Sequence, residues 1–420
     1  MRRRLKAIFI GSVGNLVEWY DFYAYAAFSL YFAHLFFPGT DPVVQQLNAA
    51  LLFAFGFIVR PLGGVLFGHL ADRHGRRIAL TLSVVLMCFG SLIIAVTPTY
   101  QSIGLAAPAI LLVARLIQGL SLGGEYGTSA TYLSEMAHER HRGFFSSFQY
   151  VTLIGGQLLA IVVLLLLQKV FLTPQQLSEW GWRIPFVIGA LLAVVAAVMR
   201  KELPETQAFT DAKRRVQTES TLQALFRYPR ELMLVVGMTM GGTAAFYTYT
   251  TYMQKYLKLS VGLSDDQTTL VTAGTLILAI LLQPLYGAIS DRIGRKPMLI
   301  GFGVAGTLFT IPLLTSLQQA QGPMAAFLLI GAAWLIVSGY TAINAVVKAE
   351  LFPAHVRATG VGLPYALTVS LFGGTAESMA LWFKSMGRER WFFYYLTACI
   401  ACSLVVYVLM RDTKKESAIE

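Results

Sequence analysis

The chain has 420 residues, of which 56% are hydrophobic and only 13% are charged, and its mean hydropathy is +0.61. Soluble domains usually carry roughly a quarter charged residues, so this composition excludes an ordinary soluble protein and indicates a chain that crosses a membrane many times. The net charge of +11 would suggest nucleic acid as the partner of a soluble chain, but in a membrane protein basic loops on one side explain it.

Twelve apolar stretches are long enough to cross a bilayer, which takes about 20 residues. They cover residues 7–37, 48–71, 78–97, 105–137, 143–168, 183–201, 230–257, 267–290, 297–317, 323–351, 358–384 and 391–410. The first follows the basic start MRRRLK without a small-residue cleavage pattern, so we interpret it as a retained helix and not a signal peptide. The expected fold class is therefore an all-α membrane protein with twelve transmembrane helices.

The orientation follows from the basic residues. Twelve spans place both termini on one side of the membrane, and most of the 33 Lys and Arg residues fall at that side. The positive-inside rule then predicts that both termini are cytoplasmic. A polar segment divides the spans into two sets of six and is expected to be a cytoplasmic linker. The predicted domains are a bundle at 1–201, the linker at 202–229, a second bundle at 230–411 and a tail at 412–420.

Two loop motifs recur in the second half. GHLADRHGRR, which contains Asp72, follows the second span, and GAISDRIGRK, which contains Asp291, follows the eighth. SEMAHERHRG, with Glu135, follows the fourth span, and AELFPAHVRATG, with Glu350, follows the tenth. The two pairs have nearly the same offset along the chain, which indicates a duplicated six-helix unit.

Glu18 and Asp21 stand out in the first span, because a charge inside the membrane raises the energy of insertion by ~2.5–3.5 kcal/mol and should face the bundle interior. They lie on one helical face, which Asn15 and Tyr25 extend. Arg115 in the fourth span is the expected partner of Asp21. The pair is either purely structural or couples a proton, which Asp21 or alternatively Glu18 would take when an anionic substrate draws the arginine away.

Arg60 is the strongest candidate to bind a carboxylate, since it lies near the middle of the second span with no acidic residue within eleven positions. A guanidinium can grip a carboxylate with two hydrogen bonds. Arg115 could serve both binding and coupling, and Tyr25 is a further candidate contact. Gln157, which follows two glycines in the fifth span, either binds substrate or joins two helices.

The seventh span supplies a polar stripe for a second carboxylate. Tyr247, Thr251 and Lys255 fall at i, i+4 and i+8, after Gly241-Gly242, two glycines that could let the span bend at the cavity. Tyrosines also anchor helices at membrane surfaces, which is the alternative interpretation. In the eleventh span, Glu377 is an acid without an evident partner and a candidate second proton site.

The repeated loops resemble the signature of the major facilitator superfamily, and EWYDF, VRPLGG, ARLIQGLSLGGEYGTSATYLSEM, QYVTLIGGQLLA and FYTYTTYMQKYL resemble its metabolite:proton symporter branch. The resemblance covers essentially the whole chain. It implies two pseudo-symmetric bundles in a bacterial inner membrane and alternating-access uptake of α-ketoglutarate or a similar dicarboxylate with protons. Branch members that carry citrate, shikimate, proline or betaine are the alternatives.

The same resemblance implies cytoplasmic salt-bridge networks that gate the carrier. Their members are Asp72, Arg76, Glu135 and Arg142 in the first half, and Asp291, Arg295, Glu350 and Arg357 in the second. Phe352-Pro353 interrupts the second copy, so its geometry need not match the first. A functional monomer surrounded by membrane lipid is expected.

Other classes of function have little support in the sequence. The six histidines lie at span ends or in loops, and Cys88, Cys399 and Cys402 lie in apolar runs, so neither a metal nor another cofactor is expected. We find no phosphate-binding loop or assembled nucleophile for an enzyme, and no filter loop for a channel. A sensory receptor that has lost transport remains an alternative to a carrier.

Overall fold

The computed structural model is all-helical over the residues it describes, which are 2–74, 76–123, 134, 139–201, 225, 227–353, 356–415 and 417–419. Within the described residues, each of the twelve expected spans overlaps a helix or a run of consecutive helices, and the second part of the fourth span, after residue 123, lies almost entirely outside them. Among these residues, eight helical stretches are long and apolar enough to cross a membrane, and Thr81–Val96 and Ala106–Leu122 are shorter apolar helices. The protein is thus an all-α membrane protein with the twelve-helix arrangement that the sequence predicts.

The first half contains six spans and several short connecting helices. Its elements are α1 (Arg2–Phe36), α2 (Pro42–Ile58), α3 (Arg60–His74), α4 (Arg76–Val96), α5 (Tyr100–Ile103), α6 (Ala106–Leu122), η1 (Glu139–His141), α8 (Arg142–Leu166), η2 (Leu167–Phe171), α9 (Pro174–Glu179), η3 (Gly181–Arg183) and α10 (Ile184–Lys201).

The second half is built in the same way. Its elements are α13 (Pro229–Tyr247), η4 (Thr248–Tyr252), α14 (Met253–Tyr256), η5 (Leu257–Val261), α15 (Asp265–Ile293), α16 (Arg295–Gln318), α17 (Pro323–Thr341), α18 (Asn344–Leu351), α19 (Arg357–Thr368), η6 (Val369–Gly373), α20 (Ala376–Ser385) and α21 (Arg390–Leu409). The predicted linker lies almost entirely outside the described residues.

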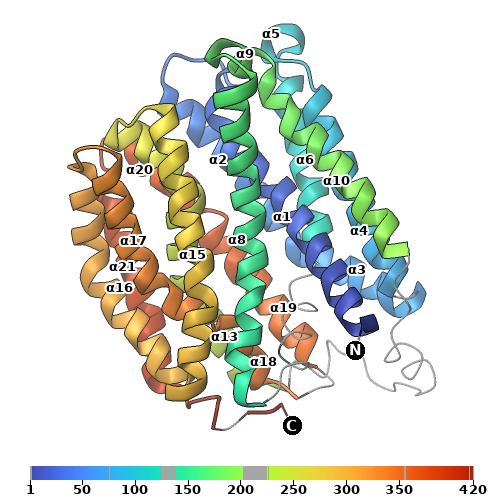
Figure 1. Cartoon of the computed structure of the whole chain (residues 1–420), viewed down its shortest axis with the longest axis vertical. Coiled ribbons are helices and arrows are strands. Elements are labelled where there is room, and N and C mark those ends of the chain that lie inside the picture. The colour runs from blue at the N-terminus through green and yellow to red at the C-terminus, as the bar shows by residue number, and fades with distance from the viewer. Residues whose placement is uncertain are drawn as a thin grey trace.

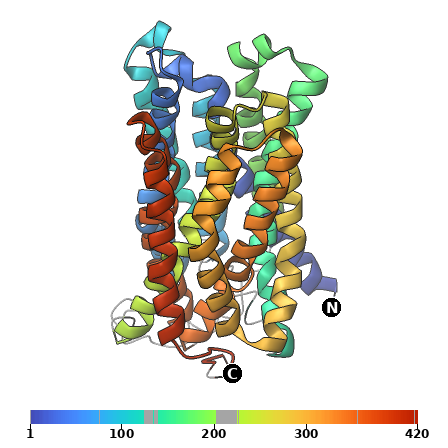
Figure 2. The same ribbon diagram turned by 90° about the vertical axis from the view of Figure 1, so that its left-hand side faces the viewer.

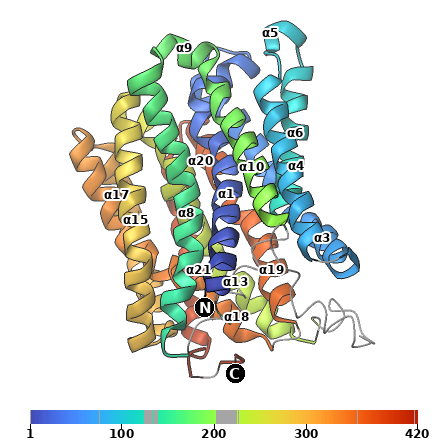
Figure 3. The same ribbon diagram turned by 45° about the vertical axis from the view of Figure 1, so that its right-hand side comes forward.

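The two halves lie side by side, with α8 of the first half next to α15 of the second (Figure 1). Both chain termini are at one end of the molecule, which we call the terminal end (Figure 2). The opposite end, which carries α5 and α9, is the distal end (Figure 3). At the terminal end Gly143 and Gly287 let α8 and α15 touch, since a Cβ on Gly143 would lie 2.7 Å from the Gly287 carbonyl oxygen.

The second span, expected at 48–71, is one apolar stretch over Pro42–Phe67 with a one-residue interruption of the helix at Val59. α2 ends at Ile58 and α3 begins at Arg60, because Pro61 has no N–H to donate to the Phe57 carbonyl. The hydroxyl of Ser370 in the second half donates to that carbonyl instead, at 2.5 Å. The break therefore places Arg60 at the start of a new helix, and a side chain of the other half satisfies the freed carbonyl.

Small residues set the distance between this broken span and α6. A Cβ on Gly119 would overlap the carbonyl oxygen of Gly56, and one on Gly63 would overlap that of Leu120. The two backbones are therefore in direct contact, as is usual where glycines line a helix interface in a membrane. This close crossing brings Arg60 on α3 and Arg115 on α6 into one region of the first half.

We predict that Gly119→Ala destabilises the protein, because the added methyl group must push α6 away from α2. Overpacking of this kind typically costs about 1–3 kcal/mol. Thermal unfolding in detergent should show a lower midpoint for this variant. Gly301→Ala on α16 is the matched control, since nothing lies within 4 Å of its new methyl group. Equal midpoints for the two variants would contradict the direct backbone contact.

Candidate functional site

Arg60 and Arg115 lie around the same aromatic ring. Their guanidinium carbons are 4.5 Å and 4.2 Å from the ring centre of Phe22. Arg60 also lies 3.8 Å from the ring of Phe57, and Arg115 lies 4.6 Å from that of Tyr25. Both arginines are buried, with 5% and 0% of their surface exposed. Aromatic faces attract a desolvated cation by ~2 kcal/mol, so these rings hold two positive charges close together.

Neither guanidinium has all its donors occupied. The Nε atom and one terminal nitrogen of Arg60, and the same two atoms of Arg115, have no hydrogen-bond partner. Within the described part of the chain, neither arginine forms an ion pair with a carboxylate. A buried charged donor without a partner is costly, so the arrangement suits a small anion that would bring its own oxygen atoms.

Polar side chains surround the two cations. The hydroxyls of Tyr23, Tyr25 and Tyr247 are buried and make no hydrogen bond of ordinary geometry, although Tyr247 lies next to both Arg60 and Tyr23. Gln157 is also buried, and its amide oxygen has no partner. These groups, from α1, α8 and α13, can contact a carboxylate or a carbonyl oxygen of a ligand.

Asp21 lies in α1 and is fully buried. The sequence predicted a direct ion pair between Asp21 and Arg115, but the two side chains are joined through a third residue. The Oδ2 atom of Asp21 accepts hydrogen bonds from Ser91 and, at 3.4 Å, from the amide nitrogen of Gln118. The amide oxygen of Gln118 in turn accepts from Arg115 at 2.6 Å. Gln118 thus stands between the carboxylate and the guanidinium. Gln118 lies one turn beyond Arg115 on α6, and Arg115 itself contacts α1 at the Phe22 carbonyl, to which it donates at 3.4 Å.

The rest of the predicted stripe on α1 is buried as well. Glu18 has 0% of its surface exposed. Asn15 accepts a hydrogen bond from the indole of Trp19 at 3.0 Å and donates to Thr152 on α8 at 2.9 Å. The ring of Trp19 lies 5.1 Å from the guanidinium of Arg60. Asn15 therefore orients one of the rings that hold Arg60.

The seventh span differs from the expected regular helix. α13 runs from Pro229 to Tyr247, so Gly241-Gly242 does not interrupt the helix. Instead, a Cβ on Gly241 would lie 2.5 Å from the Ile400 backbone, so this glycine permits close packing of α13 on α21. A π-helical turn, η4, follows, and because it has more residues per turn than an α-helix it shifts the angular position of Lys255 relative to Tyr247. The three predicted residues of this span are buried but do not form one α-helical stripe.

Lys255 is already paired with a carboxylate. Its Nζ atom lies 3.1 Å from Oε1 of Glu377 on α20, and both side chains are almost completely buried. Glu377, expected to have no partner, therefore has one. Lys255 also donates to the carbonyl of Ala26 on α1, and neighbouring Gln254 donates to that of Ala27 at 3.2 Å. These bonds join the halves toward the distal end.

The terminal end is closed by part of the predicted second network. Arg295 lies 2.8 Å from Asp291 and 3.4 Å from Glu350. Asp291 also accepts from the backbone N–H groups of Gly143 and Phe144, at 2.8 Å and 2.9 Å, in the first turn of α8. A carboxylate at a helix N-terminus is stabilised by the helix dipole. The second-half ion pairs therefore reach across to the first half.

Two other predicted gating residues, Arg142 and Arg357, contact the C-terminal tail. Arg142 donates to the carbonyl of Ile419 at 3.2 Å, and Arg357 donates to that of Ala418 at 2.8 Å, so the tail contacts both. Arg357 also donates to the Phe352 carbonyl at 2.9 Å, which reflects the altered turn in this copy. The side chains of Asp72 and Arg76, and the whole of Glu135, lie outside the described residues.

Some polar residues near the site went unnoticed in the sequence. Gln118 and Ser91 contact Asp21, and Tyr23 lies beside Tyr247. Lys348 is a further buried cation, which donates to Asn344 at 2.7 Å and lies 4.0 Å above the ring of Tyr365. Gln118 could have been found from its i+3 spacing to Arg115. The others are neutral, or are separated from their partners by long stretches of sequence.

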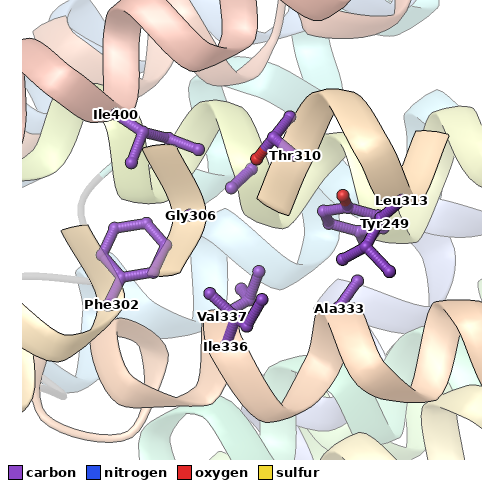
Figure 4. Close-up of a pocket in the computed structure, with 10 residues that line it drawn as sticks. Tyr249, Phe302, Gly306, Thr310, Leu313, Ala333, Ile336, Val337 and Ile400 are labelled. Carbon is purple, nitrogen blue, oxygen red and sulfur yellow. The ribbon is translucent and has the colours of Figure 1, made fainter. Parts of the chain in front are cut away.

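A small cavity of about 10 Å³ lies elsewhere, in the second half, and has room for about one water (Figure 4). Phe302, Ile336, Val337 and Ile400 make its lining largely apolar, and Thr310 and Tyr249 add hydroxyls. Neither Arg60 nor Arg115 lines it. The polar cluster around the two arginines, not this cavity, is the candidate site.

Comparison with known proteins places this arrangement in a family. The sugar (and other) transporter family matches the chain twice, over residues 7–225 and 211–420. The chain belongs to the sugar (and other) transporter family. Within the major facilitator superfamily, this transporter shares its fold with a solved proton:xylose symporter, at a TM-score of 0.77 and 19% identity over 99% of this chain and 98% of the other. It is a carrier and not an enzyme.

The transporter also has curated relatives. It is 51% identical to the α-ketoglutarate permease of Escherichia coli (strain K12) over 99% of this chain and 95% of the relative. It is 35% identical to a citrate-proton symporter of Klebsiella pneumoniae, over 88% and 83%. It is 31% identical to a proline/betaine transporter of Escherichia coli (strain K12), over 97% and 83%.

We predict that Glu377→Ala destabilises the transporter strongly, because it leaves Lys255 as an unpaired buried cation. Breaking a buried ion pair on one side costs about 3–5 kcal/mol. The double variant Lys255→Met/Glu377→Leu should recover most of that loss. Lys258→Ala is the control, since it removes half of an exposed pair with Asp265 and should cost at most ~1 kcal/mol. Chemical unfolding in detergent measures all three, and similar losses for both single variants would contradict the buried pair.

Proposed function

We propose that the protein takes up α-ketoglutarate or a similar dicarboxylate together with protons, as a monomer in a bacterial inner membrane. Its bundles are residues 1–201 and 230–411, joined by the linker 202–229 and followed by the tail 412–420. Both termini lie at one end of the molecule, and the positive-inside rule assigns that end to the cytoplasm.

The observation that carries this proposal is the pair of buried guanidiniums with unoccupied donors. Arg60 and Arg115 share the ring of Phe22, so one small dianion can reach both. Guanidinium binds carboxylate with two parallel hydrogen bonds, and phenol groups can add further ones. A zwitterion such as proline or betaine needs only one cation, so two cations favour the dianion. The 51% identity to an α-ketoglutarate permease supports the same choice over citrate or shikimate.

Asp21 is the proposed proton site, with Glu18 as the alternative. Asp21 is fully buried, and an ionised carboxylate at such a position needs favourable charge nearby. While Arg115 is directed toward it through Gln118, the ionised form is stabilised. When a substrate carboxylate attracts Arg115, that stabilisation weakens and Asp21 gains a proton. Substrate and proton therefore favour each other's binding, which is the requirement for symport.

Alternating access would use the contacts that now close both ends. Outward opening breaks the bonds from Lys255 and Gln254 to α1, and inward opening breaks those from Asp291 to α8. The predicted gating residues Asp72, Arg76, Glu135 and Arg142 of the first half would act at the same end as Asp291, Arg295, Glu350 and Arg357 of the second. Buried arginines and bridges at both ends are what an occluded state of such a carrier would need.

We predict that Arg60→Lys raises the KM for α-ketoglutarate at least tenfold, because an ammonium cannot form the paired hydrogen bonds of a guanidinium. Hydrogen bonds to charged groups contribute about 1.5–3 kcal/mol, and 1.4 kcal/mol corresponds to a tenfold change. Uptake of labelled α-ketoglutarate into proteoliposomes measures this. Arg183→Lys is the control, since Arg183 donates to the carbonyls of Ala95 and Thr97 on a different part of the first half.

The same proteoliposomes test the substrate class. Unlabelled dicarboxylates should compete with α-ketoglutarate, whereas proline and betaine should not. Stronger competition by either zwitterion than by any dicarboxylate would overturn the assignment of a dianion.

We predict that Asp21→Asn keeps the exchange of substrate across the membrane but abolishes accumulation driven by a pH gradient, since the amide cannot take up the proton. Counterflow of labelled substrate measures exchange, and uptake under an imposed gradient measures accumulation. Glu18→Gln is the paired variant and should retain accumulation. If Glu18→Gln loses it and Asp21→Asn does not, the proton site is Glu18.

A further inference from the structure

Gln118 occupies the place where a direct ion pair between Asp21 and Arg115 was expected. It is completely buried, on α6, three residues after Arg115. Its amide oxygen accepts from Arg115 at 2.6 Å, and its amide nitrogen donates to Asp21 at 3.4 Å and to Ser91 at 2.9 Å. A neutral side chain thus makes contact with both charged groups of the proposed coupling pair.

The direction of these hydrogen bonds is fixed by chemistry. A guanidinium can only donate, and an ionised carboxylate can only accept. The amide of Gln118 therefore satisfies both neighbours in one orientation only, with its oxygen toward Arg115 and its nitrogen toward Asp21. The result is a chain of hydrogen bonds that all point from the cation to the anion, and such chains strengthen each other in a low-dielectric interior.

The surroundings hold the amide in that position. On α4, Gly90 leaves room for the side chain, since a Cβ there would lie 2.7 Å from Cγ of Gln118. The next residue, Ser91, bonds both to Gln118 and to Asp21. On α10, Gly189 faces Oδ1 of Asp21, which has no hydrogen-bond partner. The carboxylate therefore has one oxygen bound to this relay and one oxygen left without a donor.

We propose that Gln118 is the positioning residue through which Asp21 and Arg115 respond to each other; this inference rests on the proton-coupled transport proposed above. Proton binding at Asp21 weakens it as an acceptor, which weakens the chain and releases Arg115 toward a substrate carboxylate. Conversely, a substrate that draws Arg115 away leaves the amide less polarised, and the ionised carboxylate is then less well stabilised. The two effects are one coupling free energy, so they must be equal in size.

If Gln118 had a purely structural role, the expected experimental result would differ. Polar side chains buried between membrane helices often only hold the helices together. Gln46 does this in the same half, where it bonds to the hydroxyl and carbonyl of Ser29 on α1 and contacts neither arginine by hydrogen bond. Gln46→Leu is therefore a matched control for the loss of a buried glutamine from the first bundle.

The test compares wild type, Gln118→Leu, Gln46→Leu and Asp21→Asn in proteoliposomes. It measures counterflow, accumulation under a pH gradient, and the pH dependence of α-ketoglutarate binding. Gln118→Leu is expected to keep counterflow within about threefold of wild type, to lose at least tenfold in accumulation, and to bind substrate with an affinity that changes less with pH. Gln46→Leu is expected to keep the wild-type pH dependence.

A Gln118→Leu variant that accumulates substrate like wild type, with the same pH dependence of binding, would overturn the relay while leaving proton coupling intact. If wild type itself shows no accumulation driven by the pH gradient, the proposed function fails, whatever Gln118 does. Asp21→Asn separates these outcomes, because it tests the proton site without removing the glutamine.

A second variant covers the case in which Gln118→Leu does not fold. Gln118→Glu keeps the size of the side chain but places a carboxylate between Arg115 and Asp21. It should hold Arg115 directly, weaken α-ketoglutarate binding at least tenfold, and move the midpoint of the pH profile upward, because two like charges lie side by side. Unchanged binding and an unchanged midpoint in this variant would also overturn the proposal.

Discussion

The structure depends on two guanidiniums that are buried together without a carboxylate between them. The aromatic rings around Arg60 and Arg115 attract the charges, but two nitrogen atoms of each guanidinium have no hydrogen-bond acceptor, so part of the desolvation cost remains. A bound dianion would offset that desolvation cost, because its oxygen atoms would accept hydrogen bonds from both guanidiniums. Closing both ends of the carrier is therefore more favourable when the site is filled than when it is empty, and this difference is what allows a ligand to shift a conformational equilibrium.

The backbone makes this placement of charge possible. Glycines allow α2 and α3 to cross α6 in direct contact, and Pro61 starts a new helix directly after Arg60. Without the close crossing, the two arginines could not share the ring of Phe22. The carbonyl that Pro61 leaves free is bound by Ser370 of the other half. The same local feature therefore positions a cation and joins the two bundles.

Much of the architecture could be predicted from the sequence, because hydropathy, the positions of charged residues and the repeated loops can be recognised without knowing the fold. The buried charges were also visible, since Asp21, Arg60 and Arg115 interrupt apolar runs. The residues that contact these buried charges were harder to identify from the sequence. Glu377 meets Lys255 only after two distant spans pack together, and Gln118 is neutral, so its i+3 spacing to Arg115 is the only signal of its role in the sequence.

Local backbone detail was partly accessible to sequence reasoning. The break before Arg60 follows from Pro61 and could have been anticipated. The π-helical turn at η4 could not, because the side-chain pattern Tyr247, Thr251 and Lys255 fits a regular α-helix equally well. Which hydrogen bonds the backbone adopts there is decided by packing against α20 and the first half.

At both ends of the molecule, a charged group bonds to the backbone of the other half and forms its ion pair within its own half. Asp291 bonds to α8 across the halves but keeps Arg295 as an ion-pair partner within its own half. Lys255 bonds to a carbonyl of α1 across the halves but keeps Glu377 within its own. When either end opens, the hydrogen bonds from these two groups to backbone groups of the other half break, and each buried charge keeps its own partner. The ion pair that does join the halves, between Lys169 on η2 and Asp266 on α15, is exposed to solvent, where separating two charges costs at most ~1 kcal/mol. A gate made from an ion pair between halves would instead leave two unpaired charges in a poorly solvated interface, at a cost of several kcal/mol. Keeping these two buried ion pairs each within one half therefore keeps the opening free energy small enough for substrate and proton binding to control it.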